Sequence, residues 1–209
     1  MVGMTGERSG DGRLTAPSAE RNKGPILAVL RRFLPERGLV LEIASGTGQH
    51  VVHYAEALPS LAWQPTDINA EHLASIAAWI RHAGLSNVRA PIALDVGGAW
   101  PDERFDALIC CNMIHIAPWQ ATLDLMRGAS KTVVPGGVLF LYGPYKRFGR
   151  HTAPSNEQFD LSLQARNPDW GLRDMETVIE LAATSGFDLA EIVEMPANNS
   201  SVVFRRRAG

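Results

Sequence analysis

The turn Gly46-Thr47-Gly48 follows a short apolar segment and has the composition of a backbone that can lie close to a ligand. Glycine tolerates positive φ and carries no side chain, so such a turn can be tight and can approach a bound molecule. Glu42 precedes it in the spacing Glu-x-Ala-x-Gly-x-Gly. Similar glycines occur in strand-to-helix turns that bind nothing. The turn by itself therefore marks a position without identifying a ligand.

Two acidic residues follow at the ends of the next two apolar runs. Asp67 lies 19 residues after Gly48, and a carboxylate there can accept hydrogen bonds from both ribose hydroxyls of a nucleoside. Its alternative role is a helix cap, since Asn69 follows closely. Asp95 could accept from the amine of an adenine, and Val96 could pack on the ring. Together these residues predict a ligand that contains a nucleoside.

The rest of the sequence alternates between short apolar runs and helical periodicity. Strands are predicted at 39–45, 61–68, 87–96, 105–114, 136–145, 187–195 and 200–207, and helices at 24–34, 49–58, 69–84, 118–133 and 172–186. Such alternation gives right-handed crossovers and a mainly parallel sheet with helices on both faces. Only a short turn separates the last two strands, so they must form a hairpin. We therefore predict an α/β, Rossmann-like, doubly wound fold with seven strands and an antiparallel last strand.

The length of 209 residues predicts one domain over residues 18–209, preceded by a polar tail over residues 1–17 that we expect to be mobile. The net charge of −2 does not favour nucleic-acid binding. Adjacent Cys110 and Cys111 are expected to be reduced. No apolar run reaches the ~18 residues of a membrane span, and the start lacks a secretory signal. We expect a cytoplasmic protein without membrane contact, and its oligomeric state stays open.

The glycine turn, Asp67, Asp95 and the turn 134–137 (VPGG) together resemble class I S-adenosylmethionine-dependent methyltransferases. Longer phrases, among them SAERNKGPIL, NPDWGLRD and MPANNSSVVF, resemble the DUF938, or methyltransferase-like protein 26, family from about residue 18 onward. The resemblance implies S-adenosylmethionine as the cofactor, bound at the glycine turn and at the two aspartates.

Further residues are expected at the cofactor from the ends of the predicted strands and from the segment before the first helix. The full set is Arg21, Asn22, Glu42, Ala44, Ser45, Gly46, Gly48, Asp67, Ile68, Asp95, Val96, Asn112 and Met113. By the resemblance, Glu42 lies near the methionine end of the cofactor. Ala44 departs from the glycine usual at its position, and alanine adopts positive φ less easily. No metal is expected, because the histidines are not spaced as metal ligands.

The acceptor of the methyl group is expected at the same edge of the sheet. His115 is the leading candidate for a base, and Tyr142 is the second; the alternatives are a structural histidine and an aromatic plug over the cofactor. The loop 146–171 is long enough to be a lid. Substrate contacts are expected from His115, Trp119, Tyr142, Tyr145, Asn156, Phe159, Trp170, Asn198 and Asn199. The last two are also good turn formers, which is their alternative role.

The leading functional hypothesis is methyl transfer to a small molecule. One alternative is a catalytically silent protein that binds S-adenosylmethionine or acts as a scaffold, and another is an RNA or protein methyltransferase. The tetrapeptide of amino-methylating DNA enzymes is absent, because the segment 111–114 (CNMI) stands in its place. A nicotinamide-dependent enzyme fits the glycine spacing and the terminal hairpin poorly.

Overall fold

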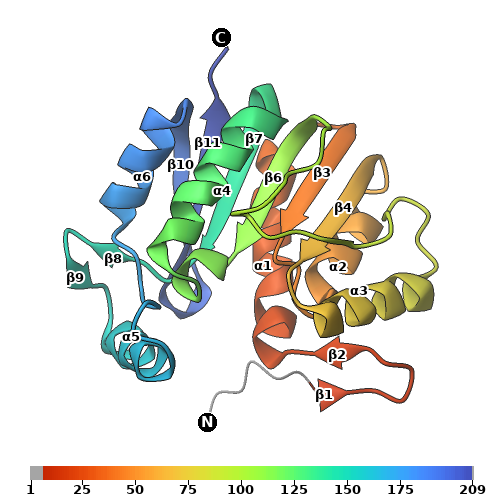
Figure 1. The fold of residues 1–209 in the computed structure, drawn as a ribbon, viewed down its shortest axis with the longest axis horizontal. Coiled ribbons are helices and arrows are strands. Elements are labelled where there is room, and N and C mark those ends of the chain that lie inside the picture. The colour runs from red at the N-terminus through yellow and green to blue at the C-terminus, as the bar shows by residue number, and fades with distance from the viewer. Residues whose placement is uncertain (1–6, 209) are drawn as a thin grey trace.

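The computed structural model describes residues 7–208, and its centre is one seven-stranded sheet (Figure 1). The strand order is β10-β11-β7-β6-β3-β4-β5. The strands are β3 (Gly38–Ile43), β4 (Leu61–Asp67), β5 (Ile92–Ala93), β6 (Phe105–Cys111), β7 (Val133–Gly143), β10 (Phe187–Met195) and β11 (Asn199–Arg206). Only β11 runs against its neighbours, since it pairs antiparallel with both β7 and β10. The predicted fold class and the reversed last strand are confirmed.

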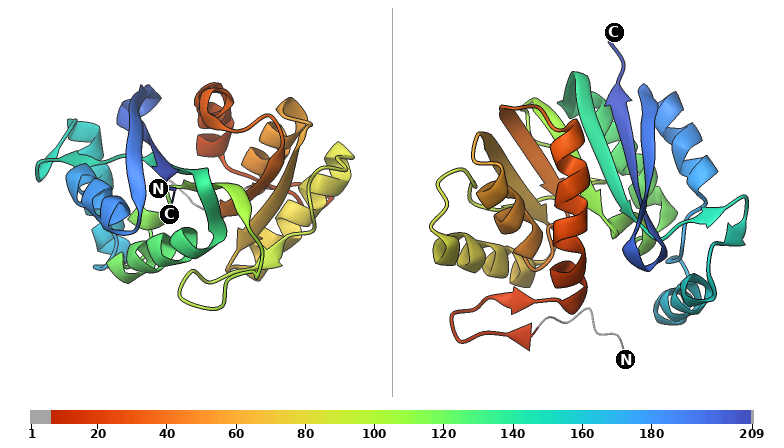
Figure 2. Two further views of the ribbon diagram at one scale, coloured as in Figure 1. Left: turned by 90° about the horizontal axis from the view of Figure 1, so that it is seen from above. Right: turned by 180° about the vertical axis from the view of Figure 1, so that it is seen from behind.

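Helices cover both faces of the sheet, as Figure 2 shows from above. They are α1 (Pro17–Phe33), α2 (Gln49–Ala57), α3 (Ala70–Ala83), α4 (Trp119–Thr132) and α6 (Met175–Thr184), whereas α5 (Pro154–Arg166) packs on β9 and covers neither face. The apolar stripes of α4 and α6 pack on one face, and those of α1, α2 and α3 pack on the other. In β6, Leu108 and Cys110 belong to the first core and Ala107 and Ile109 to the second, because neighbouring strand residues point to opposite faces. This double burial explains why β6 is apolar apart from Asp106.

Two predicted elements differ from the structure for reasons that involve proline. Helix α1 begins at Pro17 rather than at residue 24, and it continues through Pro25. Gly24 and Pro25 disfavour a helix locally, but buried residues on both sides of them hold α1 against the sheet. The third predicted strand, 87–96, is reduced to Ile92–Ala93 and one isolated bridge at Val88. Pro91 lies between these two pieces and has no N–H to donate to a ladder.

The N-terminal segment is more ordered than the sequence suggests. Strands β1 (Glu7–Arg8) and β2 (Leu14–Thr15) pair as an antiparallel hairpin, and Leu14 is buried against α3 through a bond from its N–H to Ser75. The part of the predicted mobile tail before Glu7 lies outside the described residues. The predicted tail therefore includes a hairpin that packs on the domain.

The loop 146–171 also contains regular structure. It includes the hairpin of β8 (Lys146–Arg147) and β9 (Arg150–His151), followed by the 13-residue helix α5. Within residues 7–208, no helix has both the length and the apolar character needed to cross a membrane. In the same range, no cluster of three or more histidine, cysteine or acidic side chains is arranged to hold a metal ion.

Candidate functional site

The carboxyl ends of β3, β4, β6 and β7 meet at the lower edge of the sheet in Figure 1, next to the start of α1. Two hydrogen bonds tie neighbouring strand ends together there. The N–H of Gly46 donates to Asp67 Oδ2 at 2.9 Å, and the N–H of Asn112 donates to the carbonyl of Tyr142 at 2.8 Å. The turn between β10 and β11 lies at this edge too, because Ser200 is paired with Gly143. Every strand end that was predicted to carry site residues therefore belongs to one region.

The turn after β3 has three residues in the left-handed region. Ala44 has φ 55°, Gly46 has φ 59° and Gly48 has φ 94°. A Cβ at Gly48 would lie 2.9 Å from the Cα of Ile76, so α3 packs directly on the turn and requires glycine there. At Gly46 the nearest atom to a Cβ would be 4.0 Å away, which leaves that side of the backbone open. The turn is thus packed against α3 at one glycine and free to meet a ligand at the other.

Ser45 secures the turn to β4 and does not face outward. It is buried, its N–H donates to the carbonyl of Thr66 at 2.8 Å, and its Oγ accepts from the N–H of Thr66 at 3.2 Å. The predicted role of Ser45 at the cofactor stays a prediction. Its observed side-chain contacts hold the strands together.

Asp67 lies at the end of β4, where Asn69 and not Asp67 caps α3; its role at a ribose stays a prediction. Its side chain is buried and accepts hydrogen bonds from the N–H groups of Gly46 and Asn69, each at 2.9 Å. His72 Nδ1 lies 3.2 Å from Oδ1, and this contact raises the pKa of His72. A carboxylate has about four acceptor positions, so Asp67 retains capacity for further donors such as ribose hydroxyls. Asp67 is oriented by the glycine turn and in turn fixes it.

Ile68 directly follows β4, and Asp95 and Val96 follow the neighbouring strand β5. The carboxylate of Asp95 is exposed and accepts from the N–H of Gly97 at 2.9 Å. Val96 is buried, whereas Ile68, directly after Asp67, is 70% exposed. An exposed isoleucine beside two carboxylates is an apolar surface without protein to cover it. The arrangement suits a ligand with a flat apolar ring and polar edges.

Glu42 is a buried carboxyl group near the turn. Its Oε2 has no hydrogen-bond partner among the described residues. Burial, with a smaller contribution from the negative charge of Asp67, raises the pKa of Glu42 to about 8, although a hydrogen bond from Ser45 opposes this. An unpaired buried oxygen is costly, and a cationic group of a ligand would satisfy it. Glu42, the glycine turn, Asp67 and Asp95 therefore fit S-adenosylmethionine, which carries an ammonium group, a ribose and an adenine.

His115 lies inside the protein and not at its surface. It is fully buried, its carbonyl accepts from the N–H of Gly171 at 2.9 Å, and its ring packs edge-on against Tyr145 at 4.9 Å between centroids. Burial, and secondarily the charge of Arg173, lowers its pKa to about 3. A Cβ at Gly143 would lie 2.5 Å from Nε2. The ring therefore fills space beneath the segment around Gly171, and this arrangement does not favour the predicted role as a base or substrate contact.

Tyr145 is likewise part of the core, and its hydroxyl has no partner within the described chain. Its predicted role as a substrate contact is not favoured either. Tyr142 is buried too, at 3% exposed, and belongs to the core on the other face of the sheet. Burial raises the pKa of Tyr142 to about 12, against a smaller opposite effect of Asn22. Tyr142 thus keeps its proton and can act as a donor.

His50 was not predicted, although it lies in the first turn of the helix that follows the glycine turn. Its Nε2 is 2.7 Å from Asn22 Oδ1, and its ring stacks on Tyr54 at 5.5 Å. Burial, with smaller contributions from His53 and Lys23, lowers its pKa to about 4. Its position two residues after Gly48 is the signal that would have identified it. Arg21, by contrast, is exposed and makes no hydrogen bond or ion pair within the described residues.

The predicted lid is closed by the amides that were expected to bind substrate. Asn156 Nδ2 donates to the carbonyl of Asn198 and to Thr152 Oγ1, both at 2.9 Å. Asn198 Nδ2 donates to Ser155 Oγ at 3.1 Å, and the amide of Asn199 bonds within its own turn. These contacts join the start of α5 to the β10–β11 turn. Asn156 and Asn198 therefore fasten the loop 146–171 to that turn, and a role of the three asparagines in substrate binding stays a prediction.

The aromatic residues expected at the substrate are only partly buried. Trp119 lies under Arg173 at 5.7 Å, and Trp170 lies under Arg166 at 5.3 Å. Phe159, on α5, is partly buried as well. Met113 is buried at the end of β6 behind Asn112, which has φ 63°. These side chains surround the edge, and no described contact joins the tryptophans to each other.

A buried carboxylate that sequence reasoning missed holds the lid in place. Asp160 Oδ2 lies 2.7 Å from Lys146 Nζ and 2.8 Å from His151 Nε2, and Oδ1 accepts from the N–H of Leu172 at 2.8 Å. Burial alone would raise the pKa of Asp160, but these hydrogen bonds lower it to about 2. Arg173 adds bonds to the carbonyls of Ile114 and Ala117. Asp160 thus joins α5 to the β8–β9 hairpin within the loop 146–171, and Arg173, just after the loop, attaches the chain to the segment that follows β6.

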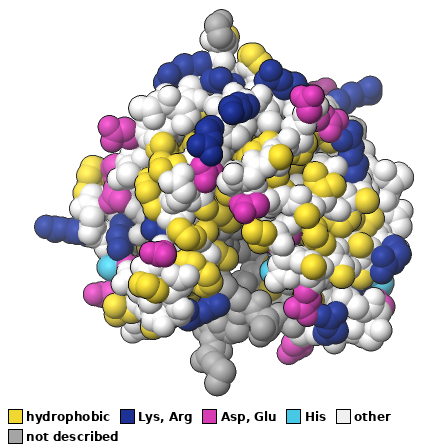
Figure 3. Space-filling model, viewed as in Figure 1, with side chains coloured by type: hydrophobic (Ala, Val, Ile, Leu, Met, Phe, Trp, Pro, Cys, Tyr) yellow, Lys and Arg dark blue, Asp and Glu magenta, His cyan; other side chains and the backbone are white. Residues whose placement is uncertain are grey.

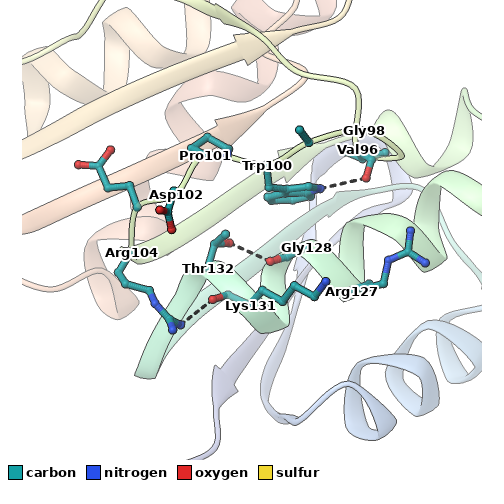
Figure 4. A pocket seen from close by; sticks show the side chains of 12 residues that line it. Val96, Gly98, Trp100, Pro101, Asp102, Arg104, Arg127, Gly128, Lys131 and Thr132 are labelled. Carbon is teal, nitrogen blue, oxygen red and sulfur yellow. Dashed lines mark hydrogen bonds between the residues drawn. The ribbon is translucent and has the colours of Figure 1, made fainter.

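A cavity of about 440 Å³ lies away from this edge, between residues 96–104 and α4 (Figure 4). Trp100 forms one wall and donates from Nε1 to the carbonyl of Val96 at 2.9 Å. Its ring lies directly on Gly128, where a side chain would clash with it. Of the predicted site residues, only Val96 lines the cavity. The cavity is therefore separate from the candidate site.

The comparisons with known proteins agree with this geometry. The family model DUF938, described as a protein of unknown function, matches residues 13–206. An O-methyltransferase family protein from Burkholderia thailandensis is 17% identical with a TM-score of 0.79, over 92% of this chain and 58% of that one. Human N-acetylserotonin methyltransferase in complex with S-adenosylmethionine is 14% identical with a TM-score of 0.76, over 91% and 53%.

A third similar structure, mitomycin 7-O-methyltransferase, is 16% identical with a TM-score of 0.78, over 91% of this chain and 54% of that chain. At these identities the likeness concerns the fold. The present chain spans less than 60% of the length of each of these three proteins.

Proposed function

Since this chain belongs to the DUF938 family and has the fold of S-adenosylmethionine-dependent methyltransferases, we propose that it binds this cofactor and methylates a small molecule. The observation that carries the proposal is the set of carboxylates Glu42, Asp67 and Asp95 beside a left-handed turn at consecutive strand ends. Two of these carboxylates, Glu42 and Asp67, are buried, and Asp95 is exposed; the three would meet the three polar parts of the cofactor. We propose both that the protein catalyses methyl transfer and that the acceptor is a small molecule.

The residues that would hold the cofactor divide by chemistry. Glu42 would take the ammonium group, because its Oε2 is buried and unpaired. Asp67 would take the ribose hydroxyls, and Asp95 the adenine amine. Ile68 and Val96 would cover the faces of the adenine ring. Ile68 is exposed directly after β4, and Val96 directly follows Asp95. The open side of Gly46 would let the ligand approach the backbone.

When bound, S-adenosylmethionine supplies an electrophilic methyl group on a sulfonium. The protein then has to align the acceptor in line with the carbon–sulfur bond and exclude water. Tyr142 would donate a hydrogen bond to the acceptor, because burial keeps its proton on the hydroxyl. The segment 146–171 would exclude water, because Asn156 and Asn198 join it by hydrogen bonds to the β10–β11 turn. An acceptor that is already nucleophilic would need no protein base.

The size and charge of the acceptor follow from the surface. The chain has a net charge of −2. On the face shown in Figure 3, hydrophobic side chains occupy the middle, and Lys and Arg lie mostly toward the rim. Outside the area that grey atoms cover, no continuous basic track crosses that face, which supports a small molecule over a nucleic acid. The fastened lid supports the same choice.

A catalytically silent protein that binds the cofactor is the second candidate, favoured by one observation. His115, which follows β6, is fully buried, and burial lowers its pKa to about 3, which disfavours a role as a base. Such a protein would sense or sequester S-adenosylmethionine and would transfer nothing.

A transfer experiment distinguishes these candidates. The protein is incubated with S-adenosylmethionine labelled in its methyl group and with a cell extract, which is then separated into small molecules, RNA and protein. The proposal predicts label in the small-molecule fraction, lost in Tyr142→Phe. Label in RNA or protein would contradict the small-molecule acceptor, and cofactor binding without any label would support the silent protein.

A further inference from the structure

The N-terminal hairpin is joined to the glycine turn by two buried polar side chains, although no residue of the hairpin belongs to the candidate cofactor site. Leu14 is 5% exposed and lies against α3. Trp79 Nε1 donates to the carbonyl of Leu14 at 2.8 Å, and the guanidinium of Arg13 lies 4.6 Å from the Trp79 ring. These contacts fasten the hairpin at a defined position on α3.

Ser75 is the first of the two connecting side chains. It is fully buried, its Oγ accepts from the N–H of Leu14 at 2.8 Å, and it donates to the carbonyl of Thr47 at 2.7 Å. Thr47 stands between the two glycines of the turn. One hydroxyl on α3 therefore links the backbone of the hairpin to the backbone of the turn.

Gln49 is the second. Its Oε1 accepts from the N–H of Ala16 at 2.6 Å and from the hydroxyl of Thr47 at 2.9 Å. Its Nε2 donates to Glu20 at 3.1 Å, within the first turns of α1. Gln49 is also buried. The same residue of the turn, Thr47, is thus held from its carbonyl by Ser75 and from its hydroxyl by Gln49.

The turn needs such restraint because its own conformation is soft. Gly46 and Gly48 both have positive φ, and glycine loses more conformational freedom on ordering than any other residue. A binding loop that is ordered in advance binds more tightly, because the ligand does not have to order it. Removing either link would therefore raise the entropy that binding must overcome.

We propose that Ser75 and Gln49 are positioning residues that make the N-terminal hairpin a structural part of the cofactor site. The hairpin holds Thr47 and thereby sets the shape of the turn from Ala44 to Gly48. Cofactor affinity accordingly depends on residues 13–16, which do not touch the cofactor. This inference rests on the proposed function for the identity of the ligand, but the coupling of hairpin and turn stands without it.

The test measures binding and local order in full-length variants. Ser75→Ala and Gln49→Met each remove one link. The double variant Glu20→Gln with Gln49→Glu keeps an oxygen at position 49 that accepts from Ala16 and Thr47. It reverses the direction of the hydrogen bond to α1, because the side chain at position 20 now donates to the one at position 49. Arg8→Ala is the matched control. It removes the ion pair between Arg8 on β1 and Glu71 on α3, and it affects neither the Ser75 link nor the Gln49 link. S-adenosylhomocysteine is titrated by calorimetry, and amide hydrogen exchange of residues 44–48 is followed without ligand.

We expect Ser75→Ala and Gln49→Met to weaken S-adenosylhomocysteine binding by about fivefold to tenfold each, the range of one lost hydrogen bond of ~1 kcal/mol. Exchange at residues 44–48 should accelerate in both, and the combined swap should restore it. Arg8→Ala should stay within about twofold of the wild type, well under the effect of one hydrogen bond. Where Ser75→Ala does not fold, Gln49→Met and its swap decide.

Two results are kept apart. If the wild type does not bind S-adenosylhomocysteine, the proposed function fails, and the exchange data still decide whether the hairpin orders the turn. If the wild type binds while the two variants match it in affinity and in exchange at residues 44–48, the positioning role of Ser75 and Gln49 is wrong.

Discussion

Replacing Ala44 with glycine should stabilise the protein, although most substitutions of alanine by glycine do the opposite. Ala44 has φ 55°, in the left-handed region. An L side chain there costs about 1–2 kcal/mol. Glycine removes that cost but gains freedom in the unfolded chain, which offsets about 0.5–1 kcal/mol. Loss of a half-buried methyl group offsets about 0.4 kcal/mol more.

The net gain expected for Ala44→Gly is therefore about 0.5 kcal/mol in the free energy of unfolding, or about 1–2 °C in Tm for a domain of this size. Two other alanines serve as controls. Ala197 has φ 58° and is exposed, so Ala197→Gly should stabilise slightly more, by about 0.8 kcal/mol. Ala28 is exposed inside α1, so Ala28→Gly should destabilise by about 1 kcal/mol.

Differential scanning calorimetry and urea unfolding of the three variants measure these changes directly. The sign carries the result, since Ala44→Gly and Ala28→Gly should move in opposite directions. A loss of stability in Ala44→Gly that equals the loss in Ala28→Gly, with a gain in Ala197→Gly, would refute a left-handed conformation at residue 44.

Three further predictions concern charge and the lid. The pKa of Glu42 is about 8 in the folded protein against its ordinary value of 4.5, so the folded state binds the extra proton and loses stability as pH rises through that interval. In urea unfolding between pH 7 and 8, Glu42→Gln should remove this decline in the free energy of unfolding. An unchanged pH dependence in the variant would contradict the raised pKa. Asp160→Asn should lower the free energy of unfolding by about 1–3 kcal/mol, because Lys146 and His151 lose their buried partner. The control Asp188→Asn removes an exposed ion pair with Arg207 and should lower it by less than about 0.5 kcal/mol. Equal losses in the two variants would count against a loop 146–171 held by Asp160. Tyr142→Phe should reduce kcat for methyl transfer at least about tenfold and leave the Kd for S-adenosylhomocysteine within about twofold, as expected for a hydrogen bond made in the transition state; a parallel loss in affinity would show that the hydroxyl serves the cofactor instead.

The sheet could be predicted from the sequence because its signals are local. Apolar runs such as β6 are buried on both faces, and the short turn between β10 and β11 leaves only an antiparallel hairpin. Asp67 and Glu42 were placed correctly at strand ends for the same reason. The start of α1 was missed, since local propensity at Gly24-Pro25 opposes a helix that tertiary packing holds.

The contacts that fix the site span long distances along the chain and carry no local signal. Ser75 bonds to Leu14 across 61 positions, and Asn156 bonds to Asn198 across 42. His115 looks available next to its strand end, and only the folding of the segment around Gly171 over it makes it buried. The type of a polar residue and its place at a strand end therefore indicate a possible site. They do not tell whether its side chain meets a ligand or another part of the protein.

Calorimetric titration of S-adenosylhomocysteine into the wild type and Asp67→Ala tests the central claim most directly. The wild type should bind one equivalent, and Asp67→Ala should bind at least about tenfold more weakly, because one charged hydrogen-bond acceptor is worth about 1.5–3 kcal/mol. Asp188→Ala, on an exposed strand at the sheet edge, should bind like the wild type. Absence of binding to the folded wild type, or equal affinity in Asp67→Ala, would contradict a nucleoside cofactor at the ends of β3 and β4.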